Sequence, residues 1–117
     1  MPYLPGTHII ASLSTSNEPL LRTYDPLKTA LNSWITDHHL TKLGEVYHNF
    51  SPSGFTAVIC LSESHLSFHT WPEYGRINLD IYLSNHERNN DGTVQTLYNK
   101  IIEFFEAQIL TEQTLKR

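Results

Sequence analysis

The clearest pattern along the chain is a strict alternation of apolar and polar positions between residues 76 and 84. This alternation predicts a β-strand with one face in a core and the other face open. Its apolar positions are Ile77, Leu79, Ile81 and Leu83. Weaker alternation, or a short β-branched run, predicts four more strands. These strands cover residues 7–13, 43–50, 55–62 and 65–71.

Two other segments have apolar residues at helical spacing. The first begins at Asp25-Pro26, a pair that suits a helix start, and continues to about residue 38. The second covers residues 93 to about 108, with Val94, Leu97, Ile101, Phe104 and Phe105 on one side. The polar segments 14–24 and 85–92 are predicted to be loops. The tail after Ile109 is also polar, and we expect it to fray.

The predicted order is therefore β-α-β-β-β-β-α. Consecutive strands joined by short turns favour an antiparallel sheet, and two amphipathic helices can cover only one of its faces. We expect an α+β two-layer sandwich with a mainly antiparallel sheet and both helices on one face. A length of 117 residues fits one domain, residues 1–117. The uncovered face would carry ionisable groups, namely His65, His69, Asp80 and Ser84.

Composition narrows the class of protein. The net charge is −4 and no basic run occurs, which argues against nucleic acid as a partner. Cys60 is the single cysteine, so an intrachain disulfide is impossible and a reducing compartment is favoured. No apolar stretch has the length needed to cross a membrane, and the first residues do not resemble a signal peptide. We expect a cytoplasmic protein.

The most specific motif lies between residues 61 and 75. It contains Glu-Ser-His-Leu at 63–66 and His-Thr-Trp-Pro-Glu-Tyr-Gly at 69–75. This run closely resembles the processing segment of the prokaryotic S-adenosylmethionine decarboxylases, a family of self-cleaving, pyruvoyl-dependent enzymes. The resemblance covers residues 6–84, is strongest from 47 to 82, and extends weakly upstream to Gly6-Thr7-His8.

The resemblance implies a proenzyme that cuts itself between Glu63 and Ser64. Ser64 Oγ would attack the Glu63 carbonyl to form an ester, and loss of the Ser64 α-proton would then release the Glu63 carboxylate. The resulting dehydroalanine would hydrolyse to a pyruvoyl group and ammonia, leaving chains 1–63 and 64–117. The pyruvoyl group would form a Schiff base with a substrate amine and act as an electron sink, in place of pyridoxal phosphate.

The same resemblance implies roles for five further residues. His69 would be the base of the elimination step, and the near-neutral pKa of histidine suits proton transfer. Thr56 takes the position of a family serine that assists processing. Substrate binding would involve Phe50, Leu66 and Glu73; Phe50 matches an aromatic residue that stacks on adenine, and Glu73 matches a substrate-binding carboxylate.

Ser84 departs from the family pattern, which has a cysteine that donates a proton to the substrate Cα. An alcohol is a far weaker acid than a thiol, whose pKa is near 8.5. Three interpretations stay open. In the first, a water, His69 or Tyr82 supplies the proton instead of residue 84. In the second, the substrate is ornithine or arginine. In the third, the chain is a poorly processed, non-catalytic partner of an active subunit. Cys60 is not expected to substitute, because four strand residues, about 13 Å, separate it from Thr56.

Seven histidines raise the question of a metal site. His65 and His69 are four residues apart on one strand, about 13 Å along it, so they cannot share an ion and no metal is expected. Asp80 is interpreted as a structural partner of Arg76 or Asn78. The expected partners are a small-molecule substrate, either S-adenosylmethionine or a basic amino acid, and a second copy of the chain. The family forms a dimer of processed pairs with sites at the subunit interface.

Overall fold

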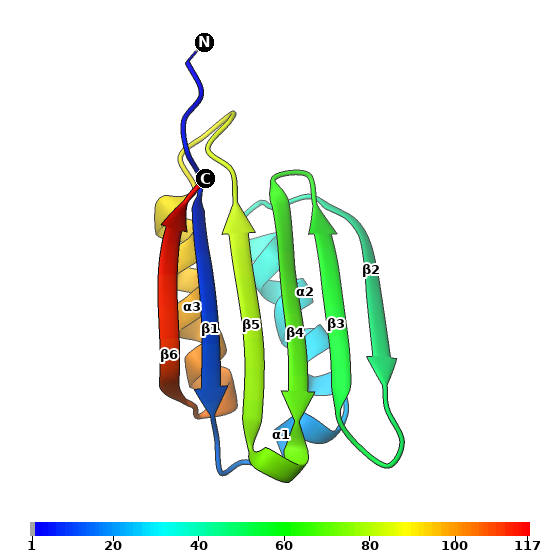
Figure 1. The fold of residues 1–117 in the computed structure, drawn as a ribbon. Coiled ribbons are helices and arrows are strands. Elements are labelled where there is room, and N and C mark those ends of the chain that lie inside the picture. Colours follow the sequence, from blue (N-terminus) through cyan, green and yellow to red (C-terminus); the bar gives the residue numbers. More distant parts are fainter. Residues whose placement is uncertain (1) are drawn as a thin grey trace.

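The fold is taken from a computed structural model, which describes residues 2–117. The helices and strands form two layers (Figure 1). In chain order they are β1 (Thr7–Ser14), α1 (Pro19–Arg22), α2 (Asp25–Asp37), β2 (Lys42–Asn49), β3 (Phe55–Leu61), β4 (Ser64–Trp71), the 3-10 helix η1 (Pro72–Tyr74), β5 (Arg76–Leu83), α3 (Asp91–Phe105) and β6 (Gln108–Lys116).

One six-stranded sheet forms the first layer, in the order β2-β3-β4-β5-β1-β6. Every neighbouring pair is antiparallel, as the short connections from β2 to β5 require. The turn between β3 and β4 contains only residues 62 and 63, so the bond after Glu63 lies at the tip of a tight hairpin.

Helices α2 and α3 form the second layer and pack on the same face of the sheet, as Figure 1 shows. Strand alternation directs one set of side chains into this layer, and these residues are buried together with the apolar sides of the helices. The fully buried large side chains include Phe55, Phe68, Phe105, Leu31, Leu66 and Leu79. The predicted α+β two-layer sandwich is therefore confirmed.

The prediction that the tail frays is wrong. Residues 108–116 form β6, which pairs with β1 along its whole length. The pairing continues beyond the strand, since Gly6 N–H donates to the Arg117 carbonyl at 2.8 Å and Arg117 N–H donates to the Gly6 carbonyl at 3.0 Å. The edge of β1 would otherwise expose unpaired backbone groups, and the tail satisfies them. The predicted order thus lacks its last strand.

The loop predicted at 14–24 also contains the short helix α1 (Pro19–Arg22). Its Leu21 is fully buried, and Leu20 and Tyr24 of the same segment are partly buried against the core. Within residues 2–117, no helix is long and apolar enough to cross a membrane.

The face of the sheet away from the helices, called the open face below, carries the polar set of each strand. The predicted residues His65, His69 and Asp80 lie there, as the alternation of β4 and β5 requires. Four apolar side chains also lie on it and are at least one-third exposed. They are Ile10, Val46, Val58 and Trp71.

Candidate active site

The carbonyl of Glu63, which self-cleavage would attack, accepts a hydrogen bond from the backbone N–H of Ser84 at 2.8 Å. This contact arises because β4 and β5 pair with Ser64 opposite Leu83, which leaves residues 63 and 84 facing each other at the strand ends. A backbone donor aimed at a carbonyl oxygen withdraws charge from the carbon and stabilises the oxyanion formed on attack. The contact uses the backbone of residue 84, so it is present with serine as well as with cysteine.

Arg88 stabilises the same turn by binding the side chain of Glu63. Its Nε and one of its terminal nitrogens donate to the two carboxylate oxygens, each at 3.0 Å. The guanidinium also donates to the carbonyls of His39 at 3.1 Å and His38 at 3.3 Å. A bidentate contact of this kind fixes the orientation of the Glu63 carboxylate as well as its distance from the guanidinium. The turn is thereby tied to the end of α2 and to the loop before α3.

Ser64 has a φ of 145°, a backbone region that residues with a side chain rarely enter. Residues held in such regions cost about 1–3 kcal/mol each and persist only where their surroundings hold them. The pairing of β4 with β3 and β5 keeps Ser64 in this backbone conformation, since Ser64 is opposite both Leu61 and Leu83. The bond before Ser64 therefore joins a polarised carbonyl to a strained residue.

Ser84 also lines a cavity of about 240 Å³. The N-terminal residues before β1 and the loop after β5 form its walls. They are Pro2, Tyr3, Leu4, Asn85 and His86. Ser84 therefore contacts the Glu63 carbonyl through its N–H and also lines this cavity.

Thr56 and His69 form the second part of the predicted machinery. They are opposite each other on β3 and β4, and Thr56 Oγ1 lies 2.7 Å from His69 Nδ1. This hydrogen bond holds the imidazole in a defined orientation on the open face, and no hydrogen bond to its Nε2 is found among residues 2–117.

A pocket of about 330 Å³ lies next to His69. Phe50 and Trp71 present aromatic surface at its rim, with exposed fractions of 50% and 47%, and Glu73 contributes a carboxylate. Two predicted substrate-binding residues, Phe50 and Glu73, thus share a concave site with the predicted base.

Leu66 does not belong to this pocket. Its side chain points into the helix layer and is fully buried. Leu66 could therefore contact a substrate only through its backbone, because the strand directs the side chain at position 66 to the core and that at position 65 to the open face. Its role in substrate binding stays a prediction.

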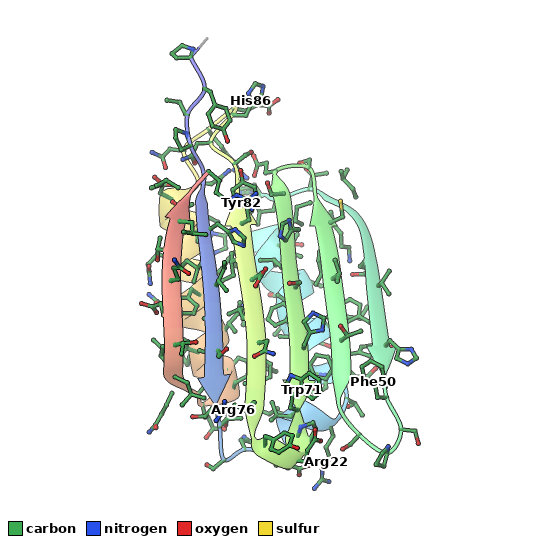
Figure 2. The ribbon with its side chains drawn as sticks, viewed as in Figure 1. Arg22, Phe50, Trp71, Arg76, Tyr82 and His86 are labelled. Carbon is green, nitrogen blue, oxygen red and sulfur yellow. The ribbon has the colours of Figure 1, made fainter. Side chains whose placement is uncertain are left out.

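The two parts of the machinery lie at opposite ends of β4. Five residues of a regular strand separate Ser64 from His69, which is about 16 Å. Figure 2 labels Phe50 and Trp71, which line the pocket with His69, at one end of the sheet, and Tyr82 and His86 at the other end. Within one chain, neither His69 nor Thr56 can reach Ser64.

Sequence reasoning missed two contacts, that of Arg88 with Glu63 and that of His8 with Asp80. Arg88 lies in a polar loop 25 residues after Glu63, and nothing in that loop marks it as a partner of the turn. His8 lies within the weak upstream match, but its neighbours are on distant strands. It faces Asp80, with 3.6 Å between Nε2 and Oδ2. Within residues 2–117, no hydrogen bond or ion pair joins Asp80 to Arg76 or Asn78, the partners that were predicted for it.

Comparison with known proteins agrees with this geometry. The S-adenosylmethionine decarboxylase family profile matches residues 7–117. An S-adenosylmethionine decarboxylase proenzyme of Archaeoglobus fulgidus is 34% identical over 112 residues, 96% of each chain. One of Picrophilus torridus is 42% identical over 86 residues, which is 74% of this chain and 66% of that protein.

A solved structure is also similar. The crystal structure of the adenosylmethionine decarboxylase of Aquifex aeolicus superposes with a TM-score of 0.84 at 27% identity, covering 99% of this chain and 92% of the other. The fold, the turn at residues 63–64 and nearly the whole sequence lead to one conclusion: this chain belongs to the S-adenosylmethionine decarboxylase family.

Proposed function

We propose that the chain is a self-processing carboxy-lyase that cleaves itself at Glu63–Ser64 and then decarboxylates S-adenosylmethionine, in the route to spermidine. The observation that carries the first step is the hydrogen bond from the Ser84 N–H to the scissile carbonyl, beside a strained Ser64. The second step follows from the family and from the pocket that joins Phe50, His69 and Glu73.

Cleavage begins when Ser64 Oγ attacks the Glu63 carbonyl carbon. The Ser84 N–H stabilises the charge on the carbonyl oxygen, and the acyl group passes from nitrogen to oxygen to form an ester. A base removes the Ser64 α-proton, the Glu63 carboxylate leaves, and addition of water to the remaining dehydroalanine releases ammonia. Arg88 holds the turn in place during these steps through its contact with the Glu63 side chain.

The base must come from a second copy of the chain, because His69 and Thr56 lie about 16 Å from Ser64 in their own chain. Two chains stacked on their open faces around a two-fold axis would bring the His69 end of one onto the Ser64 end of the other. The exposed apolar side chains of the open face suit such stacking. We therefore propose a homodimer with two sites, each formed from both chains.

The pyruvoyl group supplies an electron sink for loss of carbon dioxide from an amino acid. The chain's own residues bind and orient the substrate. Phe50 and Trp71 offer surfaces on which an adenine ring can stack, and the Glu73 carboxylate can accept hydrogen bonds from ribose hydroxyls or balance a sulfonium charge. This combination favours S-adenosylmethionine over ornithine or arginine, which have no aromatic group to stack.

Release of carbon dioxide from labelled substrates tests the substrate directly. Purified chain is incubated with S-adenosylmethionine, ornithine and arginine in parallel, and Ser64→Ala is the matched control without the pyruvoyl precursor. Turnover of S-adenosylmethionine by the wild type alone is the expected result. Activity confined to ornithine or arginine would replace the proposed substrate, and inactivity on all three would favour the non-catalytic relative.

A further inference from the structure

Three potential metal ligands from three neighbouring strands meet on the open face. His8 is on β1, His65 on β4 and Asp80 on β5, and one ligand atom of each lies within 4.8 Å of the other two. The strand register explains the grouping. His8 and His65 are both opposite Tyr82, on its two sides, and Asp80 precedes Tyr82 by two residues on the same face (Figure 2 labels Tyr82).

His8 points a buried nitrogen into this group. The residue is 5% exposed, and its Nε2 has no hydrogen-bond partner within residues 2–117. Asp80 Oδ2 is 3.6 Å away, which is too long for a hydrogen bond. A buried polar atom without a partner costs free energy, so a ligand at this position would relieve a penalty that the chain otherwise bears.

The chemistry of the three groups fits a transition-metal ion. An imidazole nitrogen that carries no proton can bind a metal, and His8 and His65 each offer one ring nitrogen to the group. Two imidazoles and one carboxylate are a common ligand set for zinc, with an open fourth position for water. The carboxylate is mobile enough to adjust, because the Asp80 side chain is 40% exposed.

We propose that His8, His65 and Asp80 bind one divalent transition-metal ion of the zinc class, with its open coordination position on the open face. Ligands about 2.0–2.1 Å from a tetrahedral ion lie about 3.3 Å from one another. The side chains must therefore close by about 1 Å or a little more, which rotation of the exposed carboxylate and of His65 can supply. The site lies on the open face, which the proposed homodimer would cover, and one of its ligands, His65, directly follows Ser64. Metal binding is inferred from the three ligands and does not require cleavage at Glu63–Ser64, so the test includes a chain that cannot cleave.

Arg117 opposes metal binding at this site. Its guanidinium lies 3.3 Å from His8 Nδ1. A guanidinium only donates, so Nδ1 accepts and the ring proton is on Nε2, the atom that the metal needs. Metal binding requires the proton to move to Nδ1 and the guanidinium to leave. Because Arg117 is an exposed residue next to β6, its side chain can be removed without affecting the core.

Metal titration of the full chain, purified without a histidine tag and stripped with EDTA, tests the proposal. Co²⁺ binding is followed by its visible absorption and Zn²⁺ binding by calorimetry, on the wild type and on Ser64→Ala. One ion per chain is expected in both. Arg117→Ala should tighten Zn²⁺ binding about tenfold, since it removes a positive charge and a competing contact. Asp80→Asn and His65→Ala should each weaken it at least about tenfold.

His48→Ala is the control, because His48 is an exposed histidine on β2, away from the three ligands. Its Zn²⁺ affinity should equal that of the wild type. The proposal is overturned if the wild type does not bind one metal ion per chain. It is also overturned if only Arg117→Ala binds the metal. Affinity unchanged by both Asp80→Asn and His65→Ala would place the ion elsewhere and would equally overturn the assignment.

Discussion

At the residue scale, the Glu63–Ser64 bond is prepared for cleavage by backbone features that no side-chain motif encodes. The carbonyl of Glu63 has its donor in the Ser84 N–H, and Ser64 is held at a φ of 145°. Both features depend on the pairing of β4 with β5 rather than on the identity of neighbouring side chains.

The strain at Ser64 predicts an order of stability for two variants that cannot cleave. Glycine enters this backbone region at little cost, whereas alanine bears a penalty of about 1–3 kcal/mol there. The greater freedom of glycine in the unfolded chain offsets about 0.4–1 kcal/mol of this difference. We expect Ser64→Gly to be about 1 kcal/mol more stable than Ser64→Ala in urea unfolding. Equal stability, or a more stable alanine variant, would show that Ser64 is not strained.

Substitution of Ser84 with cysteine is predicted to increase the decarboxylation activity. A thiol at this position can donate a proton that an alcohol cannot, and a positioned general acid contributes about 10²–10⁴-fold to a rate. Ser84→Cys should raise decarboxylation kcat, or slow inactivation during turnover, by about tenfold or more. The control is Ser84→Ala, which should behave like the wild type. If Ser84→Cys changes neither quantity, the proton comes from another group, such as Tyr82 or water.

The residue types of the site were predictable from the motif, but their grouping was not. The motif assigns Thr56 and His69 to processing, but it does not indicate that they contact each other or that they lie about 16 Å from Ser64 in the same chain. The alternation of residues 65–71, by contrast, already places Leu66 on the core side of its strand. Neither pattern indicates the Arg88–Glu63 and His8–Asp80 contacts, which join segments that are distant in the sequence.

At the element scale, the five strands with alternating or β-branched patterns and both long helices were predictable. β6 was not, because residues 108–116 are exposed along nearly their whole length and lack a regular apolar face. Its strand conformation comes from pairing with β1, a tertiary effect that local patterns do not contain.

Asp91, the first residue of α3, ties β6 and β1 to this helix. Its carboxylate accepts from Thr7 Oγ1 at 2.6 Å, from Asn85 Nδ2 at 3.0 Å and from Lys116 Nζ at 3.0 Å. These hydrogen bonds, that from Thr7 first, lower the pKa of Asp91 to about 2. The folded-state pKa is below the ordinary value of 3.8, so the carboxylate contributes stability above about pH 4 and loses it as the pH falls towards 2.

Asp91→Asn should therefore lower the free energy of unfolding by about 1 kcal/mol at neutral pH, a value reduced because the side chain is partly exposed. The difference from the parent should shrink as the pH falls from about 4 to 2. Asp25→Asn is the control, since Asp25 also begins a helix but none of the side-chain contacts found in residues 2–117 involve its carboxylate. Urea unfolding in a Ser64→Ala background measures all three chains. A constant difference across the pH range would contradict the role of the network.

At the scale of the whole molecule, the separation of Ser64 from His69 is the basis of the proposal that two chains share each site. Co-expression of two variants, each unable to form the pyruvoyl group alone, tests this arrangement. Ser64→Ala retains His69, and His69→Ala retains Ser64, so a mixed dimer has one complete site. The His69→Ala chain should then yield a pyruvoyl-bearing fragment, whereas it should yield none when expressed alone. Failure of the mixture to restore the pyruvoyl group would contradict a shared site.

The most direct measurement is the intact mass of the purified wild-type chain. Self-processing predicts two fragments, residues 1–63 and residues 64–117, with the second carrying a pyruvoyl group in place of the serine and no free amine at its N-terminus. Ser64→Ala should remain a single chain under the same conditions. A wild-type chain that stays intact at 117 residues after long incubation, or that is cut at a different bond, would contradict the central claim.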